Sequence, residues 1–416
     1  EQAPGFKDGD IYVSAKGNSD GDGSYEKPMD FVTALNTVKP GNTIWMFSAT
    51  YYVYDMYKAP VIISEDNSGT ADAYKTVSSI NGKPVTINFD GMAEEGSNRG
   101  ITLDGSYWHF YDIDICNAGD NGMLLSGDHN VIELCRFYAN HDSGLQISRY
   151  NTSYNSIEQW PSYNTILNCT AYDNKDIKTC ENADGFAAKL TCGEGNVFDG
   201  CISYCNSDDG WDLFAKVQTG SIGSVTIKNS IAYANGYLED GTNAGNGNGF
   251  KMGGDSMPGS HVLENSIAFA NKAKGIDSNS CPDIKVKNCT SINNQGANVA
   301  FYTNSAKNTD FEATGVISFR TAKEDVAENI KPVGSQDLTK IYKATNFYWD
   351  TASKTSFNTP AAGEAVTTVS ADWFASLDYS SILDGNKSVA GIVRNADGTI
   401  ALGNIFKLTD KAPAGV

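Results

Sequence analysis

The sequence contains little of the positive charge that a nucleic-acid partner would require. Only five of its 416 residues are arginine, and the formal net charge is −19 at pH 7. Because proteins bind the phosphate backbone mainly through Lys and Arg, this balance argues against nucleic acid as a partner. No apolar run approaches the roughly 18 residues of a membrane-spanning helix, so no membrane span is expected.

Histidine and paired cysteines are scarce as well. The chain has four histidines, none of them in the charged repeats described below, and nine cysteines without a Cys-x-x-Cys pair. This pattern argues against a zinc site. Equivalent places in successive repeats are taken by Cys135, Cys169, Cys201 and Cys289. They predict a column of small buried residues.

What the sequence has in quantity is a five-residue phrase in which a glycine precedes an apolar residue. The copies are SGLQI at 143–147, DGFAA at 184–188, DGWDL at 209–213, NGFKM at 248–252 and KGIDS at 274–278. Counted from Gly122, the preceding glycine of this kind, successive glycines lie 22 to 26 residues apart, except for two intervals of 41 and 39 residues. A repeat of this length is typical of a solenoid, with loops inserted in two coils.

A second repeat lies upstream of most copies. Short alternating apolar runs end in Asn140, Asn174, Asn206, Asn235, Asn271 and Asn294. Such runs predict strands that stop at a corner, because asparagine tolerates the left-handed conformation. Stacked asparagines can also hydrogen-bond to one another along the solenoid.

Three short strands per coil predict an all-β fold, a right-handed single-stranded parallel β-helix. A leucine-rich repeat is the rival, but its Leu-rich consensus is absent. We expect one domain overall, with an N-terminal strand and cap at 1–60, coils at 61–330 and an irregular tail packed on the outside at 331–416. A cap helix is predicted from Pro28 to Val38. The chain starts at Glu1 rather than Met, so we expect a mature secreted, periplasmic or cell-surface protein, and a monomer.

The middle copies of the phrase carry unusual charge. Aligned on their glycines, Asp184 and Asp209 become neighbours on adjacent coils, and Asp212 becomes the neighbour of Lys251. Asp277 follows one coil further on, and Asp208 adds a carboxylate beside Asp209. We expect each pair of neighbours to be about 5 Å apart between Cα atoms.

Four carboxylates in such a patch require neutralisation by protons or cations. Oxygen ligands without His or Cys suit a hard cation, and Ca²⁺ fits best. The predicted metal ligands are therefore Asp184, Asp208, Asp209 and Asp212. Lys251 acts as a base if its pKa is lowered, which calcium favours and neighbouring aspartates oppose.

These residues resemble the signature of polysaccharide lyase family 9. The resemblance rests on Asp184-Gly185-Phe186, on 207–212 (SDDGWD) and on 247–254 (GNGFKMGG). It implies a calcium-dependent parallel β-helix enzyme that cleaves pectin backbones, with the four aspartates as calcium ligands and Lys251 as the Brønsted base. The implied reaction is β-elimination at a galacturonate unit, which gives 4,5-unsaturated ends. The partner would be an acidic plant cell-wall polysaccharide.

The substrate within pectin stays open. Few arginines and high negative charge slightly favour rhamnogalacturonan I, which carries fewer carboxylates than the alternative, pectate (homogalacturonan). Candidate substrate contacts are Gln146, Arg149, Trp160, Tyr237 and Asp277. Three other classes remain: a glycoside hydrolase on the same fold, although its Gly-His-Gly and Arg-x-Lys elements are absent; a non-catalytic calcium-dependent carbohydrate-binding β-helix; and a purely structural solenoid.

Overall fold

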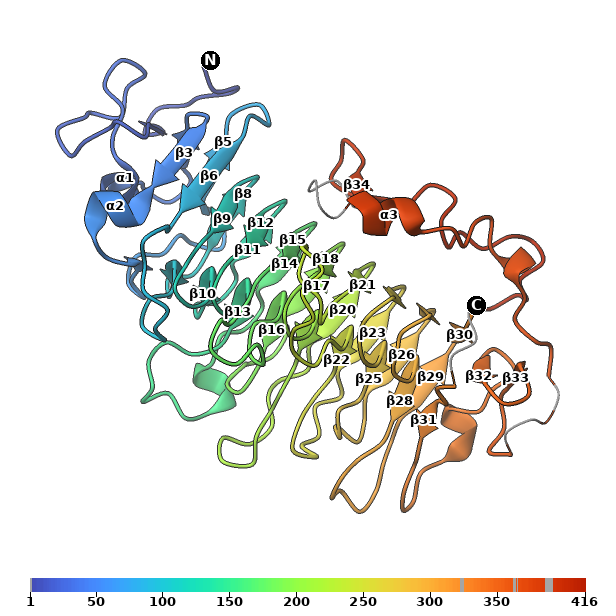
Figure 1. The fold of residues 1–416 in the computed structure, drawn as a ribbon. Coiled ribbons are helices and arrows are strands. Elements are labelled where there is room, and N and C mark those ends of the chain that lie inside the picture. The colour runs from blue at the N-terminus through green and yellow to red at the C-terminus, as the bar shows by residue number, and fades with distance from the viewer. Residues whose placement is uncertain (1, 322–324, 362–363, 365, 386–391) are drawn as a thin grey trace.

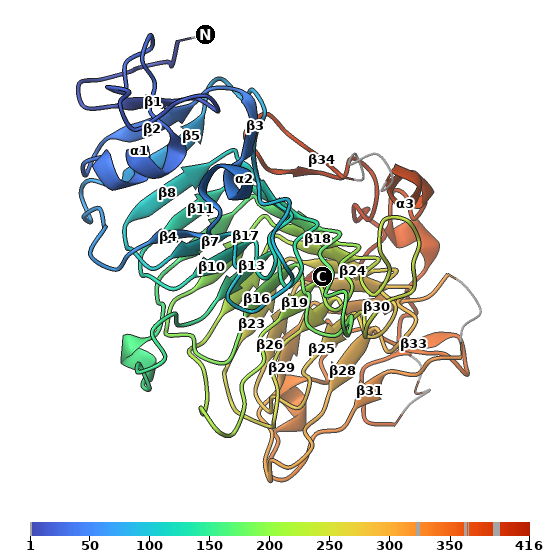
Figure 2. The same cartoon turned by 60° about the vertical axis from the view of Figure 1, so that its left-hand side comes forward.

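The computed structural model describes residues 2–321, 325–361, 364, 366–385 and 392–416. Short strands stack along one axis into three parallel sheets, which we call A, B and C (Figures 1 and 2). Each full coil contributes one strand to each sheet in the order A, B, C. The predicted parallel β-helix is confirmed.

Within the described residues, the three sheets contain 11, 10 and 10 strands. Sheet A consists of β1 (Ile11–Val13), β2 (Thr43–Met46), β5 (Lys75–Ser79), β8 (Trp108–Tyr111), β11 (Val131–Glu133), β14 (Thr165–Leu167), β17 (Val197–Asp199), β20 (Thr226–Lys228), β23 (Val262–Glu264), β26 (Lys285–Lys287) and β29 (Glu312–Thr314). Sheet B consists of β3 (Ala49–Tyr52), β6 (Val85–Asn88), β9 (Asp114–Cys116), β12 (Arg136–Tyr138), β15 (Thr170–Tyr172), β18 (Ile202–Tyr204), β21 (Ile231–Tyr233), β24 (Ile267–Phe269), β27 (Thr290–Ile292) and β30 (Ile317–Phe319). Sheet C consists of β4 (Val61–Ile63), β7 (Ile101–Leu103), β10 (Met123–Leu125), β13 (Leu145–Ile147), β16 (Phe186–Ala188), β19 (Trp211–Asp212), β22 (Phe250–Lys251), β25 (Ile276–Asp277), β28 (Val299–Phe301) and β31 (Asn329–Ile330).

The strands stack residue over residue, so each coil places the same kind of side chain inside. In the three-residue strands of sheet A from β11 onward the middle residue points inward, as Ile166, Phe198 and Ile227 do in successive coils. All three are fully buried in one continuous apolar core. Removing this column of side chains from water stabilises the solenoid.

The glycine of the repeated phrase is fixed by the spacing of the coils. A Cβ atom on Gly210 would lie 2.6 Å from the carbonyl oxygen of Gly249, and one on Gly249 would lie 2.7 Å from that of Gly275. Any side chain at this point would push adjacent coils apart. The repeat therefore marks a close backbone approach, which only glycine permits.

The asparagines form the predicted hydrogen-bonded column, the asparagine ladder. Along it the Nδ2 of each member donates to the Oδ1 of the next at 2.8–3.0 Å, through Asn140, Asn174, Asn206, Asn235, Asn271 and Asn294. All six are fully buried. The ladder follows the strands of sheet B and lines the turn that leads to sheet C.

The cysteine column is confirmed too. Buried Cys135, Cys169, Cys201 and Cys289 all lie in the core. All nine cysteines are among the described residues, and none takes part in a disulfide. The column therefore fills space rather than linking coils.

The N-terminal end carries the helix α1 (Phe31–Thr37), capped by Asp30, whose carboxylate accepts a hydrogen bond from the Thr33 N–H at 3.2 Å. This helix lies inside the range predicted for the cap. A second short helix, α2 (Val53–Tyr57), follows β3. Because β1, β2 and β3 already belong to sheets A and B, the stacked strands begin before residue 61, the predicted start of the coils.

The tail after β31 packs against the outside of the solenoid. It contains the hairpins β32 (Tyr348–Asp350)–β33 (Thr355–Phe357) and β34 (Val393–Arg394)–β35 (Ile400–Ala401), the helix α3 (Ser380–Gly385) and the 3₁₀ turns η2 (Leu338–Lys340) and η3 (Ala371–Trp373). Figure 1 shows it running back along the stack. Phe406 lies 4.9 Å from Phe269 between ring centroids, and Arg394 donates to the Gly200 carbonyl at 2.7 Å. Among the described residues, no helix combines the length and apolar character needed to cross a membrane.

Candidate active site and cation site

The charged residues lie on sheet C in the predicted register. Asp212, at the end of β19, pairs with Lys251 at the end of β22, and Lys251 pairs with Asp277 on β25. The same pairing places Asp184, two residues before Phe186, beside Asp209, two residues before Trp211. The glycine-based alignment is therefore confirmed.

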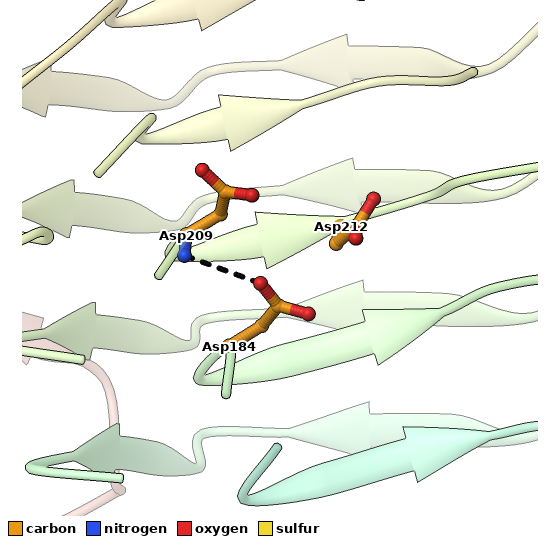
Figure 3. A group of neighbouring side chains, drawn as sticks. All are labelled: Asp184, Asp209 and Asp212. Atoms are coloured by element: carbon orange, nitrogen blue, oxygen red, sulfur yellow. Dashed lines mark hydrogen bonds between the residues drawn. The ribbon is translucent and has the colours of Figure 1, made fainter. Parts of the chain in front are cut away.

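Three carboxylates converge here (Figure 3). Asp184, Asp209 and Asp212 each offer an oxygen within 4.8 Å of the others, and all three are buried. The Asp209 N–H donates to Asp184 Oδ1 at 3.1 Å, which fixes the two coils against each other. We call these three residues the acidic group.

Asp209 is held from one side only. Its Oδ1 accepts hydrogen bonds from the backbone and side-chain N–H groups of Asn248 at 2.8 and 2.9 Å. Its Oδ2 is buried and accepts no hydrogen bond, with Lys251 Nζ at 3.4 Å. A buried carboxylate oxygen without a hydrogen bond is costly, unless a cation meets it.

Asp208, the fourth predicted ligand, lies beside the acidic group without belonging to it. It is buried, and its Oδ1 accepts a hydrogen bond from the Asn246 N–H at 3.1 Å. Desolvation, followed by the charges of Asp209 and Asp184, raises the pKa of Asp208 to about 10. This carboxyl therefore prefers a proton unless positive charge arrives.

Burial also raises the pKa of two members of the acidic group. Desolvation raises the pKa of Asp184 to about 6, although Lys189 opposes the rise. Desolvation likewise raises the pKa of Asp209 to about 7, against the opposing effect of Lys251. Shifts of this kind mark a site in which negative charge is concentrated beyond what its surroundings solvate.

Two lysines flank the acidic group. Lys251 Nζ lies 3.4 Å from Asp209 Oδ2 and 3.7 Å from Asp212 Oδ2. Lys189 Nζ lies 3.0 Å from Asp184 Oδ2 and 3.6 Å from Asp212 Oδ2. The pKa of Lys251 is raised, first by Asp212, so its head is an ammonium ion in this arrangement.

An aromatic ring covers Lys251. Its Nζ lies 5.6 Å from the centroid of Phe214, within the range of a cation–π contact. A Cβ atom on Gly254 would lie 2.1 Å from this ring. Gly254 therefore makes room for Phe214, which holds the lysine head close to the acidic group.

The acidic group fits a hard divalent cation. Its donors are carboxylate oxygens from two adjacent coils, and Asp209 Oδ2 is buried without a hydrogen bond. Carboxylate oxygens are the ligands that Ca²⁺ prefers. Asp184, Asp209 and Asp212 are the residues that would hold the ion, with Asp208 alongside.

The site opens into a cleft of about 550 Å³. The cleft lies beside sheet C, and segments that link sheet B to sheet C form its wall. Its lining includes Glu94, Glu95, Asp120, His141, Asp142, Gln146, Asp176, Lys178, Glu181, Lys189, Asp212, Phe214 and Lys251. Both lysines, Lys189 and Lys251, line this cleft.

The predicted substrate contacts separate into two sets. Gln146 lines the cleft, and buried Asp277 is the strand neighbour of Lys251, with Lys274 Nζ 3.8 Å from its Oδ2. Arg149, Trp160 and Tyr237 do not line it.

Each residue of the second set serves the structure elsewhere. Arg149 donates to the Tyr154 carbonyl at 2.8 Å, and Trp160, which is 2% exposed, donates its indole N–H to the same carbonyl at 2.8 Å. Both therefore order the inserted loop. Because Trp160 is almost fully buried, this structure gives no support for its predicted contact with substrate. Tyr237 faces a different hollow, beside Ala234 and Tyr379.

The sequence reasoning missed Lys189 and Asp142. Lys189 stands four residues after Gly185, on the same strand face as Ala187, which pairs with Asp212. A small residue at this place lets the lysine reach across to the next coil, and this is the signal that would have revealed it. Asp142 stands two residues before Gly144, as Asp208 does before Gly210.

Comparison with known proteins gives one consistent result. Residues 11–310 match a family model described as Pel9A-like, right handed beta helix region. Pectate lyase L of Thermoclostridium stercorarium is 45% identical over 75% of this chain, which spans only 25% of that protein. Pectate lyase L of Paenibacillus polymyxa is 38% identical over 96% of this chain and 81% of its own length.

Solved structures agree. The crystal structure of pectate lyase Pel9A superposes with a TM-score of 0.75 at 30% identity, covering 96% of this chain and 89% of its own. A rhamnogalacturonan lyase has a TM-score of 0.69 over 97% of both chains, but its 21% identity shows only that the fold is shared. The predicted right-handed coil is confirmed by the family model, and the chain belongs to polysaccharide lyase family 9, the Pel9A-like β-helix lyases.

Proposed function

We propose that this protein cleaves pectate by calcium-assisted β-elimination. The observation that carries the proposal is the juxtaposition of the acidic group with Lys251 at the floor of a cleft. This arrangement combines a cation site with a proton acceptor, which are the two parts that elimination next to a carboxylate requires. The names of the relatives support a pectin-cleaving lyase.

In the proposed reaction, Lys251 Nζ takes the C5 proton of a galacturonate unit. The C5–H electron pair forms the C4–C5 double bond, and the C4–O4 bond breaks with its electrons staying on O4. The departing O4 takes a proton from water and becomes the hydroxyl of a new reducing end. The other product carries a 4,5-unsaturated uronate end, and the proton taken from C5 stays on Lys251 Nζ until it passes to solvent. When bound, calcium supplies positive charge that neutralises the carboxylates and stabilises charge developing on the substrate carboxylate.

The lysine must be neutral to accept this proton. In the arrangement described here the charge of Asp212 raises the pKa of Lys251 most. Desolvation lowers this pKa, and the charge of Asp209 raises it further. Neutralising these carboxylates removes the cause of the rise, whereas burial continues to disfavour the charged form. Phe214 limits the freedom of the Lys251 head and helps to aim it into the cleft.

The similar proteins favour pectate as the substrate, whereas composition and charge alone slightly favoured rhamnogalacturonan I. The relatives named pectate lyase are 45% and 38% identical, whereas the rhamnogalacturonan lyase is 21% identical. The buried position of Trp160 also removes one ring that could have stacked on a neutral sugar. Because either polymer lies in plant cell walls, an extracellular place of action is part of the proposal.

The test measures the ultraviolet absorbance of the conjugated double bond during incubation with purified pectate and with rhamnogalacturonan I. We expect product from pectate when Ca²⁺ is present, none in excess chelator, and better recovery with Ca²⁺ than with Zn²⁺. Circular dichroism should show that the fold survives chelation. Full activity in chelator would refute the cation's role, and product from rhamnogalacturonan I alone would reverse the choice of substrate.

The same assay addresses the other classes. New reducing ends without ultraviolet absorbance would indicate hydrolysis. Binding to pectate without any new ends would indicate a carbohydrate-binding solenoid, in which Lys251 is dispensable.

A further inference from the structure

Lys189 is a partly buried cation that the proposed reaction does not use. It follows β16, its side chain is 13% exposed, and its Nζ contacts Asp184 Oδ2 and Asp212 Oδ2. Lys251 approaches the acidic group from the opposite side, on β22, two strands away from β16 in sheet C. Two strand spacings separate the two backbones by about 10 Å. Both Nζ atoms nevertheless contact Asp212 Oδ2, at 3.6 and 3.7 Å, so the two lysine heads flank this carboxylate from the coils on either side of it.

The cleft needs positive charge if it is to hold an acidic polymer. Its lining contains seven acidic side chains and only three lysines, Lys178, Lys189 and Lys251. Lys178 is exposed, with its Nζ donating to the Glu94 carbonyl at 2.9 Å, and Lys251 has the role of base. Lys189 is therefore the lysine in the lining that can hold a substrate anion without taking part in proton transfer.

Its contacts also explain when it would do so. Asp184 Oδ2 and Asp212 Oδ2 belong to the acidic group that would hold a cation. A divalent cation at these carboxylates repels the nearby ammonium, and a lysine has a long flexible stem that lets its head move. The head would turn toward the cleft, which Lys189 already lines.

We propose that Lys189 is a specificity-determining residue that binds a uronate carboxylate of the polysaccharide, in a unit other than the one deprotonated by Lys251. Its ammonium becomes available for this contact once a divalent cation neutralises Asp184 and Asp212. The proposal rests on the proposed function for the nature of the polymer. It predicts that a ligand with two free carboxylates binds more tightly than a ligand with one.

The test is calorimetric and requires no turnover. Saturated galacturonate trimer is titrated, with Ca²⁺ present, into Lys251→Ala and into the double variant Lys251→Ala/Lys189→Met. We expect about tenfold weaker binding to the double variant, equivalent to about 1.4 kcal/mol. Lys189→Arg in the same background should restore binding to within about threefold, because arginine also pairs with carboxylates. Lys285→Met, which removes an equal charge from sheet A, should have no effect.

Two further titrations separate contact from support. The fully methyl-esterified trimer should bind equally to both proteins, since it offers no carboxylate to Lys189. Calcium without sugar should bind Lys189→Met at least as tightly as wild type, because a nearby positive charge is gone. If Lys189→Met does not fold, Lys189→Gln takes its place.

Equal binding of the acidic trimer to both proteins would overturn the proposal. So would a loss that the esterified trimer shares, or weakened calcium binding that Arg fails to rescue, since both indicate a structural role. Failure of the proposed function would instead appear as wild-type protein that forms no unsaturated product. The difference in trimer binding is read independently of that result.

Discussion

The asparagine ladder lies in the turn between sheets B and C, where Asp184 and Asp209 of the acidic group also lie, yet the two groups satisfy their polar atoms in different ways. Asn206 in the ladder donates to Asn235 Oδ1 at 3.0 Å and accepts from Asn174 Nδ2 at 2.9 Å. Three residues further on, Asp209 keeps a buried oxygen without a hydrogen bond. An amide carries both a donor and an acceptor, so stacked amides satisfy each other.

Stacked carboxylates have only acceptors and cannot do this. The acidic group therefore depends on partners from outside the column: the Asn248 amides, two lysine heads and a cation for which its donors are suited. The ladder stabilises the solenoid through hydrogen bonds among its own members, whereas the concentrated charge of the acidic group lowers the stability of the fold. This contrast shows how one repeat can serve structure in most coils and chemistry in three.

The largest effect is expected from replacing Lys251, the proposed base, which lies beside the acidic group and has no counterpart in the asparagine ladder. Lys251→Ala and Lys251→Arg should both lower kcat about 10³-fold, because a general base contributes 10²–10⁴ and Arg does not release its proton near neutral pH. Wild-type activity should rise with pH, since a larger fraction of Lys251 is then the free amine that accepts the proton. Initial rates of double-bond formation measure both effects.

Lys228→Ala is the matched control, because Lys228 ends β20 on sheet A of the same coil. It should retain wild-type rates. A Lys251→Arg protein with most of its activity would exclude proton abstraction by this residue and leave it an electrostatic role only.

The second largest effect is a loss of stability, which is expected when a carboxylate replaces an amide in the asparagine ladder. Asn206→Asp removes the Nδ2 donor and leaves a buried charge facing Asn235 Oδ1 without a cation. We expect the free energy of unfolding to fall by about 3 kcal/mol, as for other unpaired buried charges. Denaturant unfolding measures the loss.

Exposed Asn151, whose Oδ1 accepts from the Ser153 N–H as a carboxylate also would, provides the control. Asn151→Asp should change stability by less than about 0.5 kcal/mol. Equal stability of Asn206→Asp and wild type would mean that the ladder tolerates charge, and the contrast between the two columns would fail.

The reverse exchange should cost the cation rather than the fold. Asp209→Asn removes one of three converging carboxylates, so we expect calcium affinity, measured by calorimetry, to fall about 100-fold, or about 2.7 kcal/mol. In chelator the variant should melt no lower than wild type, because a buried charge is gone. Asp255→Asn, an exposed change of equal charge, should bind calcium normally. Unchanged calcium affinity in Asp209→Asn would place the ion elsewhere.

The smallest effect concerns pH. The folded state raises the pKa of Asp208 to about 10, so it binds a proton that the unfolded chain releases near pH 4. The metal-free protein therefore loses stability as pH rises above about 4, through the folded pKa. Asp208→Asn lacks this loss. Its melting temperature relative to wild type should rise by about 2 °C or more from pH 5 to pH 9 in chelator.

Differential scanning calorimetry at several pH values decides this point. Adding calcium should flatten the pH dependence of wild type, because the ion replaces protons as the source of neutralisation. A constant difference between the two proteins at all pH values would mean that Asp208 is ionised throughout.

The sequence alone determined the coil, its ladder and the register of the site. Glycine recurs because adjacent backbones meet there, and asparagine recurs because its amide pairs with a copy of itself. Both constraints act between neighbouring coils at a fixed offset, so a one-residue alignment carries Asp212 to Lys251 correctly. Constraints that recur at a fixed period can be read from the amino-acid sequence alone.

Only the tertiary structure decided which residues from non-repeating segments join the cleft. In the inserted loop Trp160 points inward, and Arg149 donates a hydrogen bond to the backbone of the same loop. Glu94 and Asp176, in contrast, line the cleft from other turns. Lys189 reaches Asp212 on the adjacent coil because the small Ala187, the strand partner of Asp212, leaves space between them. The placements of Trp160, Arg149, Glu94 and Asp176 depend on contacts between segments with no common period, so nothing in the repeat specifies them.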